Sequence, residues 1–149
     1  MSEIFQGFIN NNVLMTSVLA WFVAQVMKVV IVCIISKRLD FSRIIGSGGM
    51  PSSHSSFAVS LAVSIGMECG FESPMFAVCF CFALVVMYDA AGVRRSAGQQ
   101  AKILNQLVDN WGRGNFVDTD KRLKELLGHT PTEVFAGALL GIIIAVLRH

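Results

Sequence analysis

Two histidines stand in short polar motifs that are suited to phosphate chemistry. The first is His54, within residues 48–56 (Gly-Gly-Met-Pro-Ser-Ser-His-Ser-Ser), a run of small turn-forming residues between apolar segments. Glycine and proline favour a tight turn there, and the serines supply oxygens that cap a helix start. Backbone N–H groups at such a turn favour an anion, and a histidine beside it can donate a proton. The same residues also fit a capped helix start with an ordinary interfacial histidine.

The second histidine, His129, directly precedes the sequence Thr130-Pro131-Thr132-Glu133. Pro131 suits the first position of a helix, and Thr130 with Glu133 fits a capping box, which explains the carboxylate structurally. The histidine is left unexplained, just outside a helix N-terminus where Glu133 can also reach its ring. A histidine oriented by a carboxylate is a positioned nucleophile or base. One carboxylate can serve both roles.

Charged residues near the apolar segments supply candidate anion ligands. Asp89 lies near the end of an apolar run and is costly there unless it is paired, so we expect Arg94 or Arg95 as its partner. The other arginine then offers its planar fork to a phosphate. The simpler interpretation is that both arginines anchor a membrane helix. Lys28, inside the first apolar run, either extends to the interface or points inward at an anion.

The composition predicts an integral membrane protein. Of 149 residues, 54% are hydrophobic and only 15% are charged, below the quarter that is usual in soluble domains. A net charge of +2 is too small to indicate nucleic-acid binding. The four cysteines lack metal-ligand partners at zinc-like spacing and read as buried small hydrophobes.

The elements that must position these residues are helices. We expect one domain over residues 1–149, an all-α helical bundle in the membrane with about four spans. An amphipathic helix over 94–111 should lie at the membrane surface, and a short helix should end at Gly128. Gly137 and Gly141 give the last span a small-residue packing face, a candidate homodimer interface because four spans make a thin bundle. The spans are expected at 13–36, 54–69, 75–91 and 131–147.

The distribution of lysine and arginine predicts the orientation. No basic residue precedes the first span, three lie in 37–43, and most of the others lie in 92–130. The positive-inside rule therefore places the N-terminus outside and both basic regions in the cytoplasm. The two histidine motifs and the end of the third span then meet at the cytoplasmic face, most simply of a bacterial inner membrane.

The order of these motifs resembles the type 2 phosphatidic acid phosphatases and vanadium haloperoxidases. This chain and those enzymes share the order Pro-Ser-x-His, then arginine, then His-x-x-x-acid before a span rich in alanine and glycine. The longer strings at 48–55, 88–98 and 127–134 are similar to the divergent bacterial and plant branch of that superfamily, and the similarity runs from about Gln25 to the C-terminus.

The resemblance implies a metal-independent phosphatase without a cofactor, acting on a lipid or isoprenoid phosphate or pyrophosphate. His129 would be the nucleophile that attacks phosphorus, Glu133 its orienting carboxylate, and His54 the acid that protonates the leaving oxygen. Membrane lipids and the lipid substrate are then the expected partners. The implied phosphate ligands are Ser52, Ser53, Arg94, Arg95, Lys28 and Arg43, with Asp89 and Gly49 in support.

The sequence also departs from the pattern of that superfamily. Ser53 replaces a glycine, Glu133 replaces an aspartate, and the motif of lysine, six residues and arginine-proline is absent. Lys37 and Arg43 have one residue too few between them, and Lys28 lies far upstream. These departures favour an alternative, a non-catalytic protein that binds or transports phosphate or a lipid phosphate. A haloperoxidase or a serine hydrolase fits less well.

Overall fold

The computed structural model describes residues 2–36, 49–111, 123 and 128–149. Within these ranges every regular element is a helix, which confirms the all-α prediction. A single left-handed glycine turn joins α4 to α5, where Ser73 caps the start of α5. The elements in chain order are α1 (Ser2–Asn10), α2 (Asn12–Ser36), α4 (Ser53–Cys69), α5 (Pro74–Tyr88), the π-helix η1 (Asp89–Val93), α6 (Arg94–Trp111) and α7 (Pro131–Arg148).

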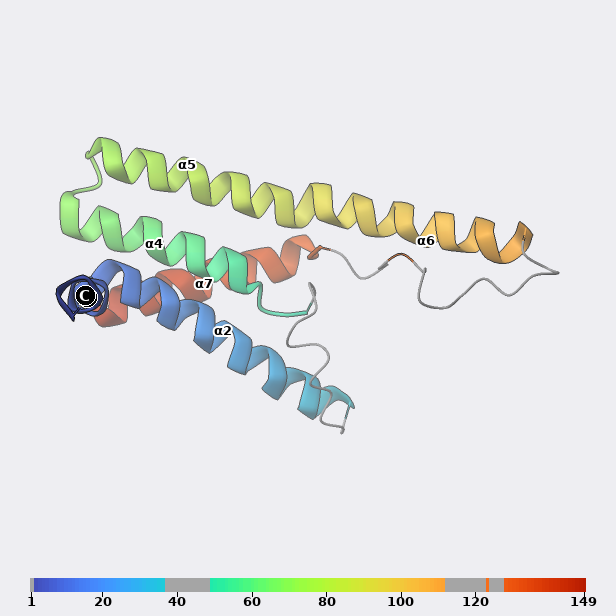
Figure 1. Cartoon of the computed structure of the whole chain (residues 1–149), viewed down its shortest axis with the longest axis horizontal. Coiled ribbons are helices and arrows are strands. Elements are labelled where there is room, and N and C mark those ends of the chain that lie inside the picture. The colour runs from blue at the N-terminus through green and yellow to red at the C-terminus, as the bar shows by residue number, and fades with distance from the viewer. Residues whose placement is uncertain (1, 37–48, 112–122, 124–127) are drawn as a thin grey trace.

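Helix α4 is the central element, packed against α2, α5 and α7 (Figure 1). This position explains a composition that is unusual for a membrane helix, because five of its serines are buried. Ser56 donates a hydrogen bond from its hydroxyl to the Ala20 carbonyl of α2 at 3.0 Å, and Ser60 donates to Phe57 of its own helix at 2.9 Å. Neighbouring helices thus shield α4 from lipid, so its surface need not be apolar.

The closest helix contact is between α4 and α7. A methyl group added at Gly137 would collide with the Ser52 carbonyl oxygen, and one added at Gly141 would lie 2.5 Å from the Ser56 carbonyl oxygen. Both glycines are buried in this contact. The predicted packing face is therefore confirmed, but its assignment as a homodimer interface was wrong. It is occupied by α4 of the same chain, because only glycine permits so close an approach of two backbones.

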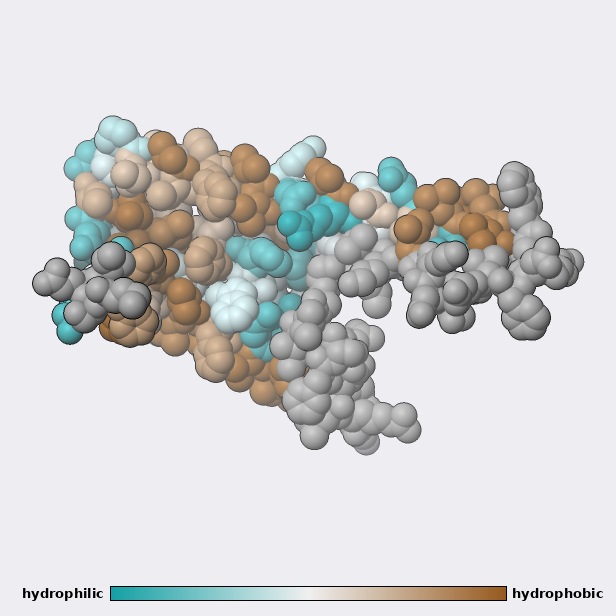
Figure 2. Space-filling model, viewed as in Figure 1, coloured by the Kyte–Doolittle hydropathy of each residue, from teal (hydrophilic) through white to brown (hydrophobic). Residues whose placement is uncertain are grey.

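The distribution of side-chain sizes is that of a membrane protein. The buried apolar residues are mainly alanines, whereas large apolar residues such as Phe22, Val85 and Ile143 are 56%, 65% and 52% exposed. Figure 2 shows hydrophobic surface between hydrophilic clusters along the helical bundle. In the described residues three helices are long and apolar enough to cross a membrane: Asn12–Ile34, Pro74–Val108 and Pro131–Arg148.

The predicted element boundaries agree closely with the structure, with two differences. α4 covers the expected 54–69 segment, but it has 17 residues and is more polar than the other three, so its crossing of the membrane stays a prediction. The expected break after residue 91 is absent, because η1 joins α5 to α6 and α6 continues in the same direction (Figure 1). The surface location of 94–111 also stays a prediction. The expected helix before Gly128 lies outside the described residues.

Candidate active site

The polar motifs meet at one end of the bundle, where α4 and α7 begin and α5 passes into η1 (Figure 1). A cavity of about 260 Å³ opens there. Both predicted catalytic histidines contribute to its wall, as do the Asp89–Arg94 pair and an apolar strip from α5. The lining residues are His54, Val85, Val86, Asp89, Ala90, Arg94, Gly128 and His129.

The start of α7 fixes the ring of His129. The capping box is present: the Thr130 hydroxyl accepts from the Glu133 backbone, and the Glu133 carboxylate accepts from the Thr130 backbone. The same carboxylate oxygen, Oε2, lies 3.1 Å from Nδ1 of His129. An ionised carboxylate only accepts hydrogen bonds, so Nδ1 carries the proton and Nε2 keeps its lone pair. Glu133 therefore makes both contacts that the sequence suggested, one to the helix start and one to the His129 ring.

Backbone hydrogen bonds tie the three segments together. The Ser52 N–H donates to the Glu133 carbonyl at 3.0 Å, and the His129 N–H donates to the Ala90 carbonyl of η1 at 2.9 Å. Gly128 has a φ of +90°, and a methyl group there would collide with the Arg95 backbone. Only glycine fits both conditions, which explains its place directly before the histidine. The positions of the histidines thus depend on main-chain contacts rather than on flexible side chains.

The two imidazole rings lie close together. Their centroids are 6.5 Å apart and the ring planes are inclined by 58°. His129 is 3% exposed, whereas His54 is solvent-accessible on the first turn of α4. Burial lowers the pKa of His129 below its ordinary value, and the hydrogen bond to Glu133 opposes this effect. A lowered pKa keeps the buried imidazole neutral at pH 7, as a nucleophile requires.

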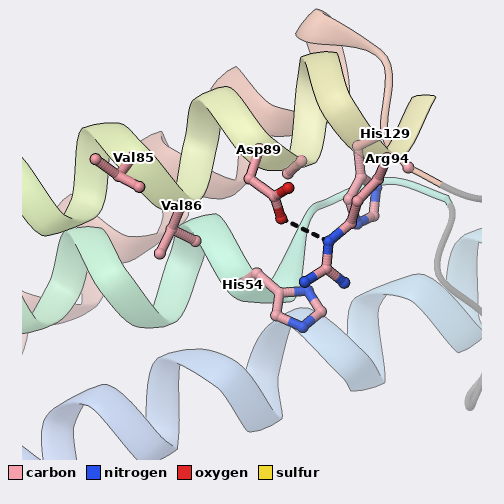
Figure 3. A pocket seen from close by; sticks show the side chains of 8 residues that line it. His54, Val85, Val86, Asp89, Arg94 and His129 are labelled. Atoms are coloured by element: carbon pink, nitrogen blue, oxygen red, sulfur yellow. Dashed lines mark hydrogen bonds and ion pairs between the residues drawn. The ribbon is translucent and has the colours of Figure 1, made fainter. Parts of the chain in front are cut away.

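Asp89 pairs across η1 with Arg94, one of the two arginines that the sequence offered as its partner. Arg94 Nε donates to Asp89 Oδ2 at 2.6 Å, and both side chains are partly exposed. Figure 3 shows the Arg94 guanidinium between Asp89 and His54. Because the aspartate engages Nε, the two terminal nitrogens of the fork stay available for a phosphate. The π-helical turn, which the sequence did not indicate, sets Arg94 on the cavity side; such turns are frequent at functional sites.

Lys28 of α2 approaches the same site from the other side. Its side chain is 3% exposed and its methylenes lie against Gly49, where an added methyl group would be 3.4 Å from Lys28 Cγ. The ammonium interacts electrostatically with Glu133 and with both histidines. Lys28 thus lies near the site, although it is not among the residues that line the cavity and its position in the sequence does not match the lysine motif of the resembling family.

Other predicted phosphate ligands are not brought into the cavity. Ser52 is fully buried, and its hydroxyl oxygen caps α4 by accepting from the Ser55 N–H and hydroxyl. Ser53 is also buried, and Arg95 meets Gly128 through its backbone. Arg43 lies outside the described residues. The apolar wall of Val85, Val86 and Ala90 was missed, because nothing distinguishes these residues from other apolar residues of a span.

Comparison with known proteins identifies the family. Residues 9–144 match the sequence model described as the divergent PAP2 family. The chain belongs to this family. It is also 43% identical over 151 residues to the uncharacterized membrane protein YuiD of Bacillus subtilis (strain 168), an alignment that covers 93% of this chain and 94% of that protein. No solved structure matches. The chain is therefore an integral membrane protein of the divergent PAP2 family.

Proposed function

We propose that this protein is a membrane-embedded phosphatase that hydrolyses a lipid or isoprenoid phosphate or pyrophosphate through a phosphohistidine. The observation that carries the proposal is the pairing of His54 and His129 across one cavity, with the second ring held by Glu133. One imidazole is buried and fixed by a carboxylate, whereas the other is accessible. This asymmetry suits a nucleophile and a proton donor.

In the first step, the Nε2 lone pair of His129 attacks phosphorus and the bond from phosphorus to the leaving oxygen breaks. The negative charge of the bound phosphate favours the protonated form of His54, which gives its proton to that oxygen, so the alcohol or phosphate leaves in its neutral or singly protonated form. Glu133 accepts from Nδ1–H and stabilises the positive charge that the phosphorylated imidazole acquires. Arg94 and Lys28 balance the charge of the phosphoryl oxygens.

In the second step, His54 is neutral and accepts a proton from water. The resulting hydroxide attacks phosphorus, the bond to Nε2 breaks, and the lone pair returns to His129. Inorganic phosphate leaves and His54 is again protonated, so each turnover consumes one water molecule. The reacting imidazoles and Arg94 line the cavity, with Arg94 paired to Asp89, and Glu133 and Lys28 act from beside it.

The apolar side of the cavity supports a substrate with a hydrocarbon tail. Val85 and Val86 line the cavity on α5, and Val85 is 65% exposed toward the surface of a helix that is apolar enough to cross a membrane. The hydrocarbon tail of a substrate whose phosphate lies at Arg94 would therefore extend into lipid along α5. By the positive-inside rule, the site takes lipids from the cytoplasmic leaflet of the inner membrane.

The test is phosphate release by the purified protein from a panel of lipid and isoprenoid phosphates, with vanadate as inhibitor. His129→Ala should abolish release, whereas Glu72→Ala, an exposed carboxylate of the α4–α5 turn, should not change it. His54→Ala should lose more activity on a lipid phosphate than on p-nitrophenyl phosphate, whose leaving group needs no proton. An acid-labile phosphoprotein should form in the wild type and not in His129→Ala.

The non-catalytic alternative gives a different result in the same experiments. Phosphate or vanadate would raise the thermal stability of the wild type while no phosphate is released from any substrate. Turnover that persists in purified His129→Ala would contradict the proposal directly.

A further inference from the structure

A second cavity, of about 320 Å³, lies at the opposite end of the bundle from the two histidines. It is bounded by the start of α2 and by the ends of α4 and α7, whereas the first site lies where α4 and α7 begin (Figure 1). Most of its lining is polar, which is unusual between helices that pack through alanine and glycine. The lining residues are Asn12, Val13, Thr16, Ser64, Glu68, Ala145, Arg148 and His149.

Ser64 gives the first sign that this cavity is a binding site. Its side chain is 7% exposed, and its hydroxyl has no hydrogen-bond partner within the described part of the chain. Ser56 and Ser60 of the same helix both have partners. A buried hydroxyl without a partner is uncommon in proteins, because its desolvation is not compensated. Since Ser64 lines the cavity, a ligand there can supply the missing hydrogen bond.

The charges around the cavity give the second sign. Glu68 at the end of α4 and Arg148 at the end of α7 are both exposed and both line the cavity. In the described ranges neither side chain forms an ion pair with the other or with a third residue. The buried floor therefore offers the unpartnered hydroxyl of Ser64 as a donor, beside the Thr16 hydroxyl, which already donates to the Asn12 carbonyl at 2.7 Å. The rim carries the Glu68 carboxylate and the Arg148 guanidinium, together with the imidazole of His149.

We propose that this cavity binds a group that carries both a phosphate and a primary ammonium, the ethanolamine phosphate head group of a membrane lipid. Arg148 matches the phosphate, and Glu68 accepts hydrogen bonds from the ammonium. An anionic head group without an amine would leave Glu68 unbalanced, and a simple cation would leave Arg148 unbalanced. Ser64 donates to a phosphate oxygen. Because α2 and α7 can cross a membrane, their ends lie at the level of lipid head groups.

The test measures which lipids the full chain retains. The protein is exchanged into nanodiscs with equal amounts of phosphatidylethanolamine, phosphatidylcholine and phosphatidylglycerol, and bound lipids are counted by native mass spectrometry after release. Wild type should retain phosphatidylethanolamine about tenfold over the other two, the ratio expected for one charge-assisted hydrogen bond. Glu68→Gln should lose this preference, and Arg148→Gln should lose retention of all three lipids.

Matched variants separate the site from general effects on the bundle. Glu72→Gln makes the same charge change at the same end of α4 outside the cavity and should keep the preference. Ser64→Ala should weaken retention several-fold, whereas Ser60→Ala, whose hydroxyl bonds within its own helix, should not. Equal retention of the three lipids by the wild type, or equal behaviour of Glu68→Gln and Glu72→Gln, would overturn the proposal.

A soluble source of the same head group is distinguished by glycerophosphoethanolamine added to the protein in detergent. A rise in the unfolding temperature of wild type, absent in Glu68→Gln, would show that the head group alone is recognised. No rise, together with selective retention in nanodiscs, would assign the site to the intact lipid. Failure in both assays refutes the proposal and leaves the histidine site unaffected.

Discussion

The dual role of Glu133 gives the sharpest test of the catalytic proposal. Glu133→Gln keeps the size of the side chain and one acceptor oxygen, but replaces two charge-assisted hydrogen bonds, from His129 Nδ1 and the Thr130 N–H, by neutral ones. A charge-assisted bond contributes about 1.5–3 kcal/mol and a neutral one about 0.5–1.5 kcal/mol. The loss at the imidazole is therefore about 1–2 kcal/mol, or about 5- to 30-fold in kcat/KM.

The pH dependence of the same variant has a definite sign. The Glu133 carboxylate raises the pKa of His129, whereas burial, the larger effect, lowers it. Removing the carboxylate leaves only the lowering effect, so the pKa of His129 falls further. Because the nucleophile acts in its neutral form, the acidic limb of the kcat/KM profile should move to lower pH while the plateau rate decreases.

Thr130→Ala is the matched control for these measurements. It removes the hydroxyl that accepts from the Glu133 backbone, but it leaves the bond between Glu133 and His129 in place. Its loss of stability should be about 1 kcal/mol, as for other capping residues, with an unchanged pH profile. Equal rates for wild type and Glu133→Gln, or an equal decrease in both variants, would refute the orienting role of the carboxylate.

Three further outcomes are expected. Asp89→Asn should raise KM about two- to fivefold for a phosphate substrate with little effect on kcat, because Arg94 loses the charged partner that orients its guanidinium and both side chains are partly exposed. Lys28→Met should lower kcat/KM and weaken inhibition by vanadate, measured as its inhibition constant. Gly137→Ala should lower stability by about 1–3 kcal/mol in thermal unfolding, whereas Gly7→Ala, with no atom near the added methyl group, should not.

The helix boundaries could be predicted because they depend on local chemistry. At the starts of α5 and α7, Ser73 and Thr130 accept hydrogen bonds from backbone N–H groups three residues on, and the prolines that follow them have no N–H to satisfy. The structure shows these caps where the sequence predicted them. The pairing of His129 with Glu133 follows for the same reason, since the two residues lie four positions apart across the capped start of α7. The sequence also predicted that Asp89 pairs with Arg94 or Arg95, because a carboxylate at the end of an apolar span requires a partner, but it did not indicate which of the two.

The parts that could not be predicted depend on contacts between distant segments. A continuous apolar sequence does not show whether Gly137 faces a second copy or α4, because both choices bury it equally well. Lys28 belongs to no local motif and comes near the histidines only through the packing of α2 beside α4. The π-helical turn at Asp89–Val93 inserts one residue into a helical pattern, and the sequence Asp-Ala-Ala-Gly-Val does not prescribe it.

The unbroken run from α5 through η1 into α6 has a consequence for depth in the membrane. The candidate span Pro74–Val108 has 35 residues, which at 1.5 Å per residue corresponds to about 52 Å. A hydrocarbon layer is about 30 Å thick, so roughly 20 Å of this rod must emerge into water or bend where it leaves the lipid. The hydrogen bond from the His129 N–H to the Ala90 carbonyl connects this continuous helix to the start of α7 partway along its length. A displacement of the part of α6 that extends beyond the hydrocarbon layer would therefore also move η1 and the adjoining Arg94.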